Sequence, residues 1–218
     1  MYYDLGMSSR EIRLDWEKLR TAVRYIIQRA GHDELGAVKL HKVLYYTDML
    51  SYLETGLPVT GSPYRKRPFG PTCEPLLAVV DELEREHLIS VSETDYHGYA
   101  KKSFASTSDS PTNVLSADEK KLLDDMIDFV CRNHTAKTIS DFSHDMVWQM
   151  VDFGEVIPYH NALHLIPNEV SADAMAWAKT EIEALDSYRS EPSKLQMANR
   201  DVRALRASLA KMHGHRSV

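Results

Sequence analysis

Residues 39–71, KLHKVLYYTDMLSYLETGLPVTGSPYRKRPFGP, join an aromatic, amphipathic helix pattern to a loop that ends in an aromatic-Gly-Pro corner. One face of the helix pattern has the three-and-four spacing of a buried stripe. Its members are Leu40, Val43, Leu44, Thr47, Leu50 and Leu53. Gly56 follows as a natural C-cap, because glycine adopts the left-handed conformation at little cost. The segment therefore predicts a core helix that leads into a stiff loop.

Two polar and aromatic stripes flank the leucine-rich face, and the loop adds a basic cluster between two aromatic residues. Tyrosines at such positions either pack at the edge of the core with hydroxyls toward water or contact a partner, and the sequence leaves both open. Tyrosine and arginine are enriched at binding hot spots because they offer large contact area with few torsions to freeze. We predict partner contact for Lys42, Tyr45, Tyr46, Asp48, Tyr52, Tyr64, Arg65, Arg67 and Phe69. Lys42 and Asp48 are explained equally well by an internal ion pair.

The composition is that of an ordinary globular protein, with 43% apolar and 27% charged residues among 218. No apolar run approaches the roughly 18 residues that span a bilayer, and the first residues lack the cationic start and apolar core of a secretory signal. Cys73 and Cys131 lie far apart without a second pair, so neither a zinc knuckle nor a disulfide framework is indicated. We expect a cytoplasmic protein that does not enter a membrane.

Periodicity along the chain predicts a mainly α fold with a small β-hairpin, an α+β arrangement. Residues 1–170 are expected to form one compact helical domain, and residues 171–218 a helical extension with a basic tail. That tail is either a solvated terminal helix or a contact for an acidic partner or RNA. The predicted helices span residues 15–31, 39–55, 72–87, 139–151 and 171–185, with another that opens at Ser116, and the predicted hairpin spans residues 89–107.

The sequence KLHKVLYYTD (residues 39–48) resembles the KLQKLLYYAD signature of the SocA-like antitoxin family, whose domain is called Panacea and was formerly grouped with the phage-associated protein GepA. TGLPV (55–59) is similar to the family's TGRPL element, and residues 64–71 to its Y-x-x-x-x-x-GP corner. HDMVW (144–148) followed by EVIPY (155–159) is similar to its final motif. The matching positions that we expect to be structural are Leu40, Leu44, Gly56, Gly70, Pro71, Trp148 and Pro158.

The resemblance covers about residues 15–165 and departs from the family pattern at three places, where His41 replaces glutamine, Thr47 alanine and Phe69 tyrosine. It implies an antitoxin that binds a co-encoded protein toxin directly. One family member instead delivers its toxin to the ClpXP protease, and some members are phage or prophage proteins with no known toxin. On this reading Tyr46→Ala or Arg65→Ala weakens neutralisation without unfolding the protein. Homo-oligomerisation is left open.

An enzyme is one alternative. His160-x-x-x-His164 could place two imidazoles on one helical face, but no third ligand is placed by spacing. Asp141-x-x-His144 could orient an imidazole, yet no activated serine or cysteine is identifiable. No glycine-rich phosphate loop is present in the sequence. We therefore predict no catalytic residue, no metal site and no cofactor.

A DNA-binding transcriptional regulator is the stronger alternative, because helix, helix and hairpin follow one another as in a winged helix-turn-helix. The expected recognition helix, residues 72–87, exposes Asp81, Glu82, Glu84 and Glu86 against Arg85. Such a face is repelled by DNA phosphates, and the net charge of −6 does not favour nucleic acid. Protein binding is the better account of these residues.

Overall fold

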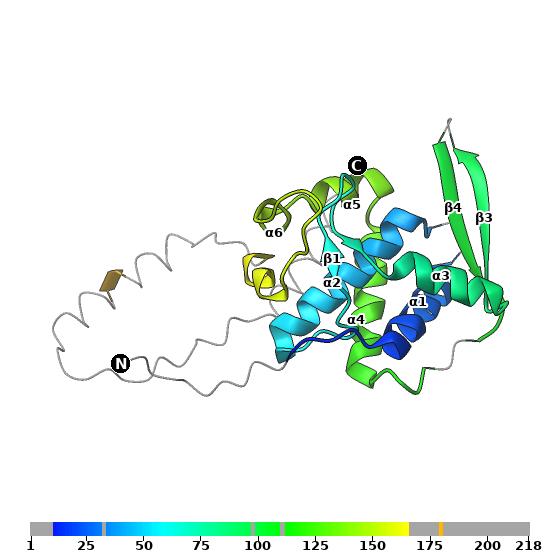
Figure 1. The fold of residues 1–218 in the computed structure, drawn as a ribbon, viewed down its shortest axis with the longest axis horizontal. Helices are drawn as coiled ribbons and strands as arrows, with labels where there is room; N and C mark the ends of the chain where they lie inside the picture. Colours follow the sequence, from blue (N-terminus) through cyan, green and yellow to red (C-terminus); the bar gives the residue numbers. More distant parts are fainter. Residues whose placement is uncertain (1–10, 32–33, 97–98, 110–111, 166–178, 181–218) are drawn as a thin grey trace.

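The computed structural model describes residues 11–31, 34–96, 99–109, 112–165 and 179–180 of the chain. Helix α2 (Ala37–Thr55) runs through the middle of this part (Figure 1). Every residue from 42 to 51 is buried, so this helix is enclosed on all sides. The helices that surround it are α1 (Trp16–Ala30), α4 (Ala117–Ile127), α5 (Ala136–Phe142), the π-helix η1 (Asp128–Arg132) and the 3-10 helix η2 (Tyr159–Leu165).

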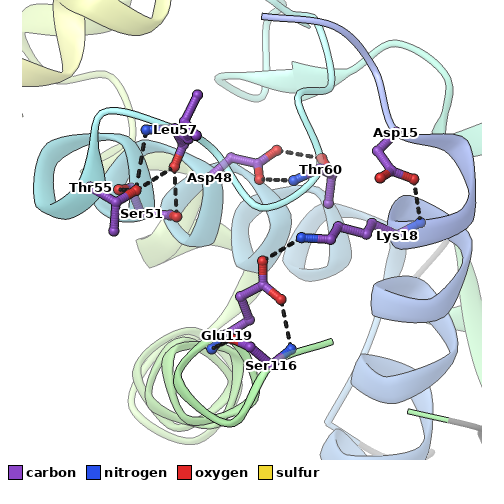
Figure 2. Close-up of polar contacts among 9 residues, drawn as sticks. All are labelled: Asp15, Lys18, Asp48, Ser51, Thr55, Leu57, Thr60, Ser116 and Glu119. Carbon is purple, nitrogen blue, oxygen red and sulfur yellow. Dashed lines mark hydrogen bonds and ion pairs between the residues drawn. The ribbon is translucent and has the colours of Figure 1, made fainter. Parts of the chain in front are cut away.

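Two predicted helix starts lie at their expected residues and are joined by an ion pair. Asp15 caps α1 by accepting a 2.9 Å hydrogen bond from the Lys18 amide. Ser116 and Glu119 form a reciprocal capping box at the start of α4. The Lys18 ammonium then lies 2.6 Å from the Glu119 carboxylate (Figure 2), which ties α1 to α4.

The β structure consists of two small antiparallel sheets. Strand β1 (Tyr64–Arg65) pairs with β2 (Thr72–Cys73), and β3 (Ile89–Tyr96) pairs with β4 (Tyr99–Ser106) as a hairpin that projects from the body (Figure 1). The base of this hairpin packs against α3 (Leu76–Arg85). The prediction of a mainly α fold with a small β part is confirmed.

Two predicted helices have different bounds. The helix expected from residue 72 begins at Leu76, because Thr72 belongs to β2 and Pro75 takes the N-cap position. The helix expected over residues 139–151 is two helices, α5 and α6 (Met146–Gln149). Asp145 separates them, since its carboxylate accepts from the Trp148 amide at 3.0 Å and so starts a new helix.

The predicted helix at residues 171–185 and the basic tail lie outside the described residues, except for Lys179 and Thr180. Among the helices that the structure describes, each is too short or too polar to cross a membrane.

Candidate protein-binding surface

Asp48 is fully buried and fastens the loop after α2. Its carboxylate accepts hydrogen bonds from the Thr60 amide at 2.7 Å and from the Thr60 hydroxyl (Figure 2), and from the Tyr64 hydroxyl at 2.8 Å. The Tyr159 hydroxyl lies 3.2 Å from the same carboxylate and donates to the Ser62 carbonyl at 2.7 Å. Burial raises the pKa of Asp48, and these donors oppose that rise. The role of Asp48 is to hold residues 60–64 against α2.

The turn between α2 and this loop is closed by side chains of the last helical turn. The Ser51 hydroxyl donates to the Leu57 carbonyl at 2.8 Å (Figure 2). The Thr55 hydroxyl donates to the Ser51 carbonyl at 2.9 Å and accepts from the Leu57 amide at 3.2 Å. Gly56 is the C-cap, with a φ of 79°. The helix therefore ends at Gly56, the C-cap that the sequence predicted.

Lys42 is also buried, with 1% of its surface exposed, and it holds the corner formed by Gly70 and Pro71. Its ammonium donates a 2.8 Å hydrogen bond to the Pro71 carbonyl. Burial lowers the pKa of Lys42 to about 7, and the charge of Asp145 opposes this shift. Gly70 has a φ of +86°, and a Cβ there would lie 2.7 Å from the Lys42 nitrogen and 2.1 Å from the Ser143 hydroxyl oxygen. The corner needs glycine both for its backbone conformation and for space.

Tyr45, Tyr46 and Tyr64 belong to the core and not to the surface, with exposed fractions of 0%, 2% and 0%. Tyr45 makes edge contacts with Tyr46 at 5.0 Å and with Tyr64 at 5.4 Å between ring centroids. Tyr46 packs against Phe129 of η1 at 5.7 Å. Burial raises the pKa of all three phenols well above the usual value. None of these rings can reach a partner while this packing persists.

The structure thus divides the nine predicted contact residues. Lys42, Tyr45, Tyr46, Asp48 and Tyr64 lie inside, because the loop of residues 57–75 covers one flank of α2 and the helices from residue 117 onward cover the other. Residues 52, 65, 67 and 69 retain exposed atoms. The proposal that Tyr46→Ala spares the fold is therefore at odds with the position of this ring, which is central to the core.

The exposed members differ in how firmly they are held. The Arg65 guanidinium pairs with Glu74 at 2.8 Å and donates to the Gly154 carbonyl at 3.0 Å. Tyr52 is half-buried against Tyr159, with ring centroids 5.8 Å apart. Arg67 is exposed, and Phe69 is the most exposed large apolar side chain of the described residues, at 67%.

A second segment, residues 146–156, lies beside this loop. The backbone of Lys66 exchanges hydrogen bonds with Gly154 and Glu155, both at 3.0 Å. The Lys66 ammonium lies 4.0 Å from the centre of the Trp148 ring, whose Nε1–H donates to the Arg67 carbonyl at 3.3 Å. Ile157, directly before Pro158, donates from its amide to the Tyr64 carbonyl at 2.7 Å. The two segments are therefore fixed to one another.

Sequence reasoning missed the apolar side chains of this second segment. Met146, Met150, Phe153 and Val156 are 41–60% exposed. Met146 and Met150 are four residues apart and therefore share one helical face, which was visible in the sequence. A single helix over residues 139–151 was expected, however, and it would have directed that face differently from the separate helix α6. We call residues 65–69 and 146–156 together the corner surface.

The groups weighed for catalysis have other roles. His144 stacks on Trp148 with centroids 4.3 Å apart, while Asp141 pairs with Lys137 at 2.6 Å. Burial raises the pKa of Cys73 to about 12 and that of Cys131 to about 11, so neither thiol ionises readily. Within the described ranges, no three histidine, cysteine or acidic residues gather as metal ligands.

Comparison with known proteins gives one positive finding. Residues 40–149 match the family model described as antitoxin SocA-like, Panacea domain. No curated protein and no solved structure matches the chain. The matched stretch makes up half of the sequence and extends from α2, with its buried Lys42 and Asp48, to the end of α6. The chain belongs to the SocA-like antitoxin family and carries its Panacea domain.

Proposed function

We propose that this protein is an antitoxin that neutralises a cognate protein toxin by direct binding, and that the corner surface is where the toxin is held. The observation that carries the proposal is the concentration of large exposed apolar side chains on two segments that are hydrogen-bonded together. Phe69, Met146, Met150, Phe153 and Val156 belong to it. Exposed apolar groups of this kind, beside cationic ones, are typical of protein interaction sites.

The charged groups around these side chains suit a partner with acidic residues. Arg67 is exposed, and it is its carbonyl, not its guanidinium, that accepts hydrogen bonds from the Trp148 side chain and the Gly70 amide. Arginine is favoured at interfaces because its planar head can pair with carboxylates in two places. We infer that Arg67 and Phe69 are the principal contacts and that Arg65, which already pairs with Glu74, contributes less.

The buried signature residues support binding indirectly. Lys42 holds Pro71 and Asp48 holds residues 60–64, so the backbone that carries Arg67 and Phe69 is anchored at both ends. A loop that is already ordered loses less entropy when it binds. The aromatic helix thus supplies rigidity to the binding surface rather than the contacts themselves.

The test is growth of cells that express the cognate toxin together with this protein. Phe69→Ala and Arg67→Glu should each reduce protection, whereas Leu57→Ala and Lys121→Glu, which change an exposed apolar and an exposed basic residue elsewhere, should protect as the wild type does. Full protection by both corner variants, at equal protein levels, would refute the assignment. Toxin abundance in the same cells separates occlusion, which leaves the toxin level unchanged, from delivery to a protease such as ClpXP, which lowers it.

DNA binding is not proposed. Asp81 and Glu84 are exposed on α3, while Glu82 on the same helix and Glu86 at its C-cap pair with Arg20. A duplex would meet mostly carboxylates on this helix.

A further inference from the structure

Charge is divided unevenly along this chain. Residues 194–218 contain six basic residues and one acid, Asp201, which gives a net charge of +5 with neutral histidines. Because the whole chain carries −6, residues 1–193 carry −11. A strongly acidic body and a basic terminal segment on one chain attract one another.

The basic segment also has a continuous apolar stripe. Its members recur at alternating spacings of three and four: Leu195, Ala198, Val202, Leu205, Leu209 and Met212. This is the pattern of an amphipathic helix, which must cover its apolar side against another surface. At 100° per residue, Arg206 flanks the stripe, while Arg200 falls on the opposite side.

The described part of the chain contains an apolar cleft of about 60 Å³ between α3 and the base of the β3–β4 hairpin. Its walls are formed largely by Leu76, Leu77, Val80, Val91 and Phe104. Leu77 is 63% exposed, although it lies beside this cleft. The volume suits the end of one aliphatic side chain rather than a cofactor.

The rim of the cleft is acidic. Asp81 and Glu84 line it from α3, with Lys102 on the hairpin side. The two other acids of this region are already engaged by Arg20, which pairs with Glu82 and with Glu86. Among the described residues, Asp81 and Glu84 have no ion-pair partner, so this rim attracts a cation.

We propose that residues 194–212 of the same chain dock as an amphipathic helix on the cleft between α3 and the hairpin. The apolar stripe covers Leu77 and places one aliphatic side chain in the cleft, and Arg206 pairs with Asp81 or Glu84. Arg200 and Lys211 on the opposite side face solvent and add long-range attraction. The 28 residues between Leu165 and Lys194 can span about 65 Å even with the predicted helix at residues 171–185, which allows the segment to reach α3.

Cross-linking of the full chain, without toxin, tests this docking. Arg206→Lys keeps the positive charge and supplies an amine that a zero-length carbodiimide reagent can join to a carboxylate. We expect peptide mapping to find this lysine joined to Asp81 or Glu84. Arg200→Lys is the matched control, because it places the same amine on the opposite side of the helix and should give at least fivefold fewer of these cross-links.

A mixture of isotopically labelled and unlabelled chains identifies the occupant. Products within one isotopic form support docking on the same chain, whereas products that join labelled to unlabelled chains would assign the cleft to a second copy and overturn the proposal. Equal cross-linking by the two lysine variants would also overturn it. In hydrogen exchange, Leu205→Asp should speed the exchange of α3 amides; unchanged exchange would count against docking whether or not the toxin-binding assignment holds.

Discussion

The Lys42 ammonium donates a 2.8 Å hydrogen bond to the Pro71 carbonyl, which joins the second turn of α2 to the corner at the other end of the loop. Gly70 lies directly against this contact. Lys42 and Pro71 are 29 residues apart in sequence, and their contact makes the helix and the corner one structural unit. Arg67 and Phe69 extend from that unit toward solvent.

Gly70→Ala should destabilise the protein by about 2–4 kcal/mol, because it combines a left-handed backbone with a collision against Lys42 and Ser143. Urea unfolding measures this change. Gly154→Ala is a matched control, since Gly154 has a φ of +89° but nothing within 4 Å of an added Cβ. It should cost only the backbone strain of about 1–2 kcal/mol. Equal losses in the two variants would contradict the close packing at the corner.

Asp48→Asn should cost about 2–4 kcal/mol of folding free energy, because an amide presents a donor to groups that already donate. Tyr64→Phe removes one of those donors alone and should cost about 1–2 kcal/mol. The double variant should lose less folding free energy than the sum of the two single losses, since both residues belong to one buried network. Strict additivity in urea unfolding would show that Asp48 and Tyr64 are not coupled.

Tyr46 provides a test of burial against partner contact. Tyr46→Ala should destabilise the protein by about 3–5 kcal/mol, because it leaves a cavity beside Phe129. Tyr46→Phe should leave stability unchanged or raise it by up to about 1 kcal/mol, since the hydroxyl is buried without a hydrogen-bond partner among the described residues. Calorimetric melting distinguishes these results from a surface role, for which both variants would melt as the wild type does.

His41 should make the protein sensitive to acid. Burial, aided by the charge of Lys42, lowers the pKa of His41 to about 4, and its Nδ1 accepts from the Cys73 amide at 3.1 Å. The unfolded chain therefore takes up a proton on the His41 imidazole more readily than the folded chain does. The stability that depends on a neutral His41 is fully present above about pH 6.5 and is lost as the pH falls toward 4. The loss should be roughly 3 kcal/mol.

His41→Gln separates this effect from other titrations, because a glutamine oxygen can accept from the Cys73 amide without taking up a proton. The variant should keep most of its stability between pH 7 and pH 4 relative to the wild type. His164→Gln, which changes an exposed imidazole on η2, serves as the control. Parallel pH–stability curves for wild type and His41→Gln would rule out a role for His41.

The sequence allowed correct prediction of the helix starts at Asp15 and Ser116, the hairpin and the C-cap at Gly56, because each depends on local capping or turn chemistry. It did not reveal that both flanks of α2 are covered. A helical wheel separates an apolar stripe from its neighbours, but it carries no information about a loop that folds back over them. Asp48 illustrates this, since its partners Thr60, Tyr64 and Tyr159 come from three later positions.

The corner surface was predicted only in its first half. The aromatic and basic composition of the loop indicated Arg67 and Phe69. The exposure of Met146, Met150 and Phe153 depends on the break between α5 and α6, which was not predicted. Asp145 could have indicated that break, because aspartate three residues before a helical amide is a common N-cap. The pairing of residues 154–157 with β1 is long-range and left no local signal.

The most direct test of the central claim is the affinity of the purified full chain for its cognate toxin, measured by titration calorimetry for wild type, Phe69→Ala, Arg67→Glu and Lys121→Glu. The account predicts that both corner variants weaken binding at least tenfold, about 1.4 kcal/mol, with unfolding curves like that of the wild type, while Lys121→Glu binds normally. Wild-type affinity in both corner variants would contradict it.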